Sequence, residues 1–161
     1  MALKENYTDG EWAKLENSAF WVFNSVAAAD GVIDKREVKA FKRVLQNFSE
    51  FGNDLTREVL SSAGLNFQED NEYDLSKLGD ALGEVAGILE KKAGKENCLI
   101  FKKTLIAIGI HVGNSSGAIF SSKFSDEEVD ALKEVGTLLG VTEDELAISP
   151  SIKDIIKGIK N

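Results

Sequence analysis

Three carboxylates, Asp30, Asp34 and Glu37, lie close together in the sequence around a single glycine, Gly31. An apolar helical pattern precedes this stretch and another follows it, so the acids fall at the junction of two predicted helices. Carboxylate oxygens are the ligands that hard divalent cations such as Ca²⁺ and Mg²⁺ prefer. The stretch is therefore a candidate for part of a cation-binding site.

The spacing resembles the second half of an EF-hand calcium loop, in which acids, a glycine and an aliphatic residue precede a final glutamate. The matching positions are Asp30, Gly31, Ile33, Asp34 and Glu37. The two earlier ligand positions would be Val26 and Ala28, whose side chains contain no oxygen. A cation bound here would therefore need ligands from another part of the fold.

Helix capping explains the same residues without a metal. Asp34 and Glu37 are spaced nearly as in a capping box, in which two side chains bind backbone N–H groups at a helix start. Acids at this position also face the positive end of the helix dipole, and Gly31 suits the end of the preceding helix. Because a capping carboxylate can also be a metal ligand, both interpretations stay open.

The charge balance limits the classes of partner. The chain has 161 residues and a formal net charge of −8, which opposes binding to nucleic acid or to an anionic membrane surface. Cys98 is the only cysteine, so no intrachain disulfide can form, which fits a reducing compartment. The N-terminus has no apolar signal core, and the longest apolar run, 105–110, falls far short of the roughly 20 residues that span a bilayer. We expect a cytoplasmic protein without membrane insertion.

Apolar residues recur at three- and four-residue spacing along most of the chain, as in amphipathic helices. With a single proline, this pattern predicts an all-α fold, a compact bundle of seven to eight helices in one domain over residues 1–161. The expected helices cover about residues 9–29, 34–48, 55–60, 75–92, 96–112, 126–139, 142–147 and 150–160.

Two further expectations concern particular residues. Leu65 and Phe67 should pack on the core from a connector that covers residues 61–73. Gly79, Gly83 and Gly87 recur every four residues on one helix face, and small residues of this kind permit another helix to approach closely.

The chain contains an internal similarity. An apolar helix, a turn and a new helix start recur in residues 20–48 and 101–139, and Glu37 corresponds to Glu128. The counterpart of Asp30 in the second copy is His111 or Asn114. This predicts a pseudo-twofold repeat with halves at about 12–62 and 75–147, followed by a C-terminal helix at about 150–160. The two helix starts could then share their ligands.

The Ala-Ala-Asp-Gly-x-Ile-Asp-x-x-Glu stretch that ends at Glu37 is similar to the first motif of the TerB-like tellurite-resistance proteins. Residues 124–145 resemble the closing half of that family, so the resemblance covers roughly residues 12–147. It implies an all-α fold with an acidic metal-binding centre, a role in tellurite and general stress resistance in bacteria, and protein partners that can be membrane-associated. The chain departs from the pattern at His111-Val112-Gly113, which replaces the second Ala-Asp-Gly-like turn.

The resulting prediction is a divalent-metal site formed by Asp30, Asp34, Glu37 and Glu128, with His111 as a fifth member. Carboxylates alone favour calcium or magnesium, whereas an imidazole ligand favours zinc or manganese. The predicted function is a metal-binding module that acts through protein partners; a homodimer is compatible with this, and no nucleic-acid partner is expected. The alternatives are a metal-dependent hydrolase-type enzyme, for which no catalytic triad or phosphate loop is visible, and a metal-free interaction domain.

Overall fold

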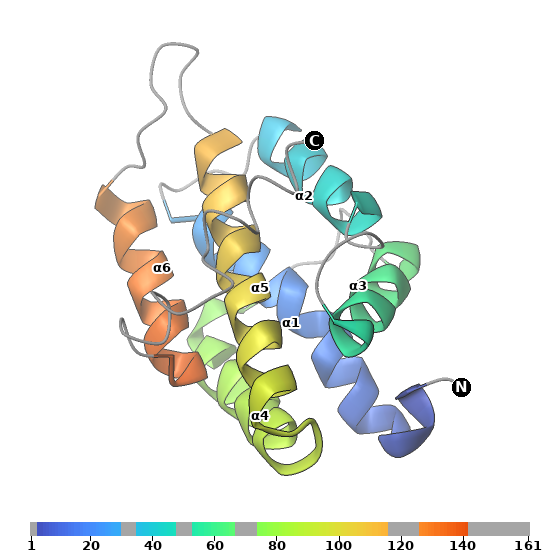
Figure 1. Ribbon diagram of the computed structural model, residues 1–161. Coiled ribbons are helices and arrows are strands. Elements are labelled where there is room, and N and C mark those ends of the chain that lie inside the picture. The colour runs from blue at the N-terminus through green and yellow to red at the C-terminus, as the bar shows by residue number, and fades with distance from the viewer. Residues whose placement is uncertain (1–2, 30–34, 48–52, 67–73, 116–125, 142–161) are drawn as a thin grey trace.

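The structure is a computed structural model that describes residues 3–29, 35–47, 53–66, 74–115 and 126–141. Every regular element in these ranges is a helix (Figure 1), which confirms the predicted all-α class. In chain order the elements are η1 (Leu3–Asn6), α1 (Asp9–Ala27), α2 (Lys35–Asn47), α3 (Asp54–Asn66), η3 (Leu75–Lys77), α4 (Leu78–Lys92), α5 (Lys95–Ser115) and α6 (Asp126–Leu139). The two helices predicted within residues 142–160 lie outside the described residues.

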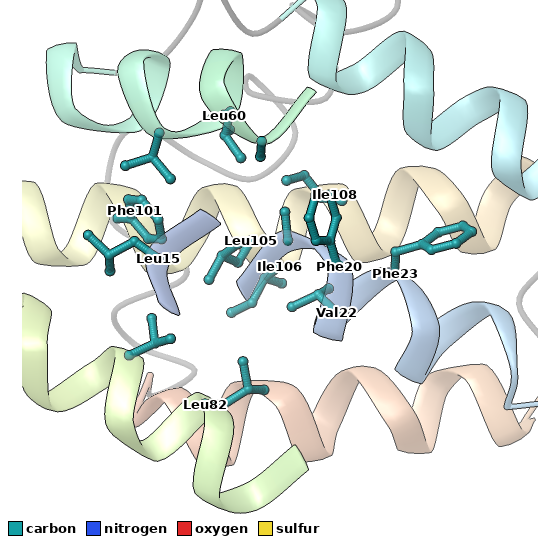
Figure 2. Close-up of a cluster of buried hydrophobic side chains, with 14 of the residues drawn as sticks. Leu15, Phe20, Val22, Phe23, Leu60, Leu82, Phe101, Leu105, Ile106 and Ile108 are labelled. Carbon is teal, nitrogen blue, oxygen red and sulfur yellow. The ribbon is translucent and has the colours of Figure 1, made fainter. Parts of the chain in front are cut away.

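Helix α5 occupies the centre of the bundle. It packs against α1, α2, α3, α4 and α6, and all of its residues from Phe101 to Gly109 are buried. Figure 2 shows side chains of α1 and α5 at the middle of the core, with Leu60 of α3 on one side and Leu82 of α4 on the other. A helix that neighbours surround on all sides must carry apolar residues nearly all round, and this is the pattern of α5.

The start of α1 is a capping box. The Thr8 hydroxyl accepts from the backbone N–H of Glu11 (3.1 Å), and the Glu11 carboxylate accepts from the backbone N–H of Thr8 (2.8 Å). The same carboxylate oxygen lies 2.5 Å from Nζ of Lys92, in the last turn of α4. The cap of one helix is thus tied to the end of another.

This arrangement makes the stability of the fold depend on pH. The hydrogen bonds from Lys92 and from the Thr8 backbone lower the pKa of Glu11 from its ordinary value of 4.5 to about 2. A carboxylate with a lowered pKa in the folded state stabilises the fold above its unfolded pKa, and this contribution is lost as the pH falls toward the folded pKa. We expect the difference in unfolding free energy between wild type and Glu11→Gln to be constant above about pH 5 and to shrink toward pH 2.

The measurement is urea denaturation of both proteins from pH 2 to pH 7. In a Lys92→Met background the same comparison should depend less on pH, because the strongest hydrogen bond to Glu11 is gone. A difference that is as large at pH 2 as at pH 7 would contradict the assignment.

Helix α3 is longer than predicted, and Leu65 was misplaced. The helix continues to Asn66 because the stripe of Leu55, Val59 and Leu60 extends to Ala63, which is also buried. Leu65 falls on the opposite face and is 88% exposed. The prediction that Leu65 packs on the core is therefore wrong, and Phe67 lies outside the described residues.

The prediction of a close helix approach along the glycines of α4 is also wrong for two of the three positions. A methyl group added to Gly83 or Gly87 would meet nothing within 4 Å, and both residues are exposed. At Gly79 the added carbon would make ordinary contact with Leu138 of α6, at 3.7 Å. Among the described glycines, the added carbon would come nearest to a neighbouring helix at Gly109 of α5, where it would lie 2.7 Å from Leu132 Cδ2.

Among the helices described, none combines the length and the apolar character that a membrane crossing requires.

Candidate metal centre

Four helix termini lie at the same end of the bundle (Figure 1). Helices α1 and α5 end there, and α2 and α6 begin there. The packing of α5 against α1, α2 and α6 holds these termini together. Three of the predicted ligand positions belong to this end of the molecule: Glu37 in the first turn of α2, His111 about one turn before the end of α5, and the backbone of Glu128 in the first turn of α6.

Glu37 is the best-defined member of the predicted set. Its side chain is only 1% exposed, although a glutamate in the first turn of a helix is usually solvated. The register of α2 explains this burial, because Glu37 shares its inner face with Phe41 and Val44, which are both fully buried. The helix thus places a carboxylate at a position that would otherwise carry an apolar residue.

Aromatic packing fixes α2 in this orientation. The Phe41 ring stacks on Phe23 of α1 with ring centroids 4.5 Å apart, and it meets Phe20 edge-on at 5.9 Å. Since Phe41 lies one turn after Glu37, these contacts determine which way the first turn of α2 faces. The carboxylate is therefore directed inward by packing.

A buried, ionised carboxylate must be stabilised by its surroundings. Removing an ionised carboxylate from water costs several kcal/mol unless hydrogen-bond donors or a positive charge compensate. The N-terminal end of α2 supplies partial positive charge from its backbone N–H groups. A divalent cation would supply much more, so burial at this position is compatible with both the cap and the ligand interpretations.

The structure describes the other predicted ligands to different extents. His111 is half-buried on α5. Asp30 and Asp34 lie outside the described residues, and for Glu128 only the backbone is described. Within the described ranges, no group of three or more His, Cys, Asp or Glu side chains is close enough to hold a metal ion. The set Asp30, Asp34, Glu37, Glu128 and His111 stays a prediction.

The sequence interpretation overlooked two lysines in the middle of α5. Lys103 is fully buried and Lys102 is 5% exposed, and Nζ of Lys102 lies 3.1 Å from the carboxylate of Glu90 on α4. Buried lysines are rare because the ammonium group must be paired. The sequence contains a sign of this burial, because the two lysines are adjacent inside an otherwise apolar helix. A helix that is buried on all sides must also bury its charged residues.

Comparisons with known proteins leave the family open. No model of a protein family matches the chain, and no solved structure matches it. The chain is 32% identical over 94 residues to a protein described as "Uncharacterized protein ORF11'" from Methanothermobacter thermautotrophicus. The match covers 58% of this chain and 58% of the relative, so the chain spans less than two thirds of that relative.

Proposed function

We propose that this chain is a divalent-cation-binding helical module that resembles the TerB-like tellurite-resistance proteins and acts through protein partners in the cytoplasm. The observation that supports this proposal best is the burial of the Glu37 side chain, 1% exposed, at the end of the bundle where four helix termini lie. A cation held near the starts of α2 and α6 would bind this carboxylate and connect the elements around it.

The proposed ligands are Asp30, Asp34, Glu37 and Glu128, with His111 as the member that selects the ion. If carboxylates alone coordinate, the ion is Ca²⁺ or Mg²⁺; if the imidazole takes part, it is Zn²⁺ or Mn²⁺. The correspondence of Glu37 with Glu128 supports a pseudo-twofold repeat, completed by further helices after Val141 to a total of seven or eight.

The test is thermal and urea unfolding of the full chain, first treated with chelator and then titrated with Ca²⁺, Mg²⁺, Mn²⁺ and Zn²⁺. A cation that binds only the folded state adds about 2.7 kcal/mol of stability at a concentration 100 times its Kd. Glu37→Gln keeps the size of the side chain but removes its charge, so we expect this variant to lose most of that gain.

The matched control is Glu134→Gln, which makes the same change at an exposed position of α6. It should leave the cation-dependent gain unchanged. The proposal fails if none of the four cations stabilises the wild type, or if Glu37→Gln responds to the cation as the wild type does.

Helix capping by the acids is the competing interpretation, and the first-turn position of Glu37 favours it. In that case Glu37→Gln changes stability equally with and without cations. The protein is then a metal-free interaction domain, and the search for function moves to its partners.

A further inference from the structure

The outer face of α2 is a concentrated basic surface on an acidic protein. Of the 19 lysines and arginines in the chain, five lie on this helix, and all five are exposed. We call this surface the basic strip; it consists of Lys35, Arg36, Lys39, Lys42 and Arg43. The only acid on α2, Glu37, is buried on the opposite face. The strip therefore presents positive charge alone over roughly a third of the helix circumference.

The basic strip is unfavourable for α2 itself. Lys39 lies one turn from both Lys35 and Arg43, and like charges at this spacing destabilise a helix. Lys35 and Arg36 also sit in the first turn, where the helix dipole disfavours cations. Among the described residues, Lys35, Arg36, Lys39 and Arg43 form no ion pair that would offset this repulsion. An anionic partner from outside would remove the repulsion.

A groove runs beside the strip. Helices α2 and α3 pack side by side at the surface of the bundle (Figure 1), and between them lies a cavity of about 500 Å³. Its lining includes Lys42 from the basic strip, Leu45 of α2, and Gly64 and Leu65 of α3. Leu65, which is 88% exposed, is one of two large apolar side chains exposed among the described residues. The surface therefore offers an apolar anchor point directly next to positive charge.

We propose that the basic strip and this groove bind an acidic, amphipathic segment of a partner protein. Carboxylates of that segment would pair with Lys39 and Arg43, while an apolar side chain would enter the groove at Leu65. A nucleic acid or an anionic membrane fits less well. Either would bring a large negative surface toward a protein of net charge −8, and a phosphate backbone would leave Leu65 without an apolar contact.

This inference rests on the proposed action through protein partners and names the chemistry of the partner. It does not depend on the cation site, so binding is measured in chelator. A failure of the peptide to bind leaves the cation-dependent stabilisation of the preceding proposal untouched, and the reverse also holds.

The probe is a fluorescein-labelled synthetic peptide of about the length of α2, with glutamates on one helical face and leucines beside them. Fluorescence anisotropy with the full chain should show saturable binding that weakens as salt is raised. Replacing the glutamates of the peptide by glutamines should weaken binding about tenfold or more.

Two variants locate the binding surface. The double variant Lys39→Glu and Arg43→Glu should lose binding to the acidic peptide by about tenfold or more, and Leu65→Ser should weaken it while leaving the salt dependence in place. The matched control is Lys133→Glu at an exposed position of α6, which should bind as the wild type does. Circular dichroism checks that every variant is folded.

The proposal is overturned if the wild type does not bind the acidic peptide, or if the double variant binds it as tightly as the wild type. It is also overturned if phosphatidylserine vesicles or a DNA duplex bind the strip more tightly than the peptide does, because the partner would then belong to another class.

Discussion

Replacing Phe41 with alanine is expected to lower the free energy of unfolding by about 3–5 kcal/mol, the range for a fully buried aromatic residue. The ring of Phe41 is 0% exposed and makes two aromatic contacts, stacked on Phe23 and edge-on to Phe20. Truncation would remove both contacts and leave a cavity between α1 and α2. Guanidinium denaturation followed by circular dichroism gives the difference directly.

Two further variants on the same helix calibrate this result. Phe41→Leu retains most of the buried volume and should cost clearly less than the alanine variant. Lys39→Ala changes an exposed residue and should not destabilise the protein by more than about 0.5 kcal/mol. A loss below about 1 kcal/mol for Phe41→Ala would mean that the aromatic cluster does not hold α2, and with it the inward orientation of Glu37 would lose its explanation.

The second large effect is expected at Gly109. A Cβ atom at this position of α5 would lie 2.7 Å from Leu132 Cδ2 of α6 and 3.3 Å from methyl groups of Val22 and Val26 on α1. The leucine can rotate away, but the two valines are fully buried and have stiff side chains. We expect Gly109→Val to destabilise the protein by about 3 kcal/mol, because α5 must move away from both neighbours.

The matched control for Gly109 is a glycine of α4. Gly87 is exposed in the interior of a helix, and an added methyl group there meets nothing within 4 Å. Gly87→Ala should therefore stabilise the protein by about 0.4–1 kcal/mol, through the lower conformational entropy of the unfolded chain. If Gly109→Val proved as stable as the wild type in the same urea titration, the close approach of α5 to α1 and α6 would be refuted.

The features that could be predicted from the sequence are those that depend on neighbouring residues along one helix. The capping box of Thr8 and Glu11 was recognisable because the two residues interact across a single turn. The inward face of α1 and the exposed basic residues of α2 follow in the same way, since apolar and charged positions recur with the helical period. At the candidate site, the sequence indicated the first-turn position of Glu37. The correspondence of Glu37 with Glu128 stays a prediction.

Tertiary structure alone decided the features that depend on which helices meet. The glycines of α4 look like a contact face in the sequence, yet the close approach lies at Gly109, because a small residue permits contact only where a second helix is present. The positions of neighbouring helices also decide which side chains are covered. Lys103 is buried at the centre of the bundle, whereas Leu65 is exposed beside a groove. The burial of Glu37 also depends on the fold. A glutamate in the first turn of a helix is usually exposed, and here the packing of Phe41 on α1 turns the carboxylate inward.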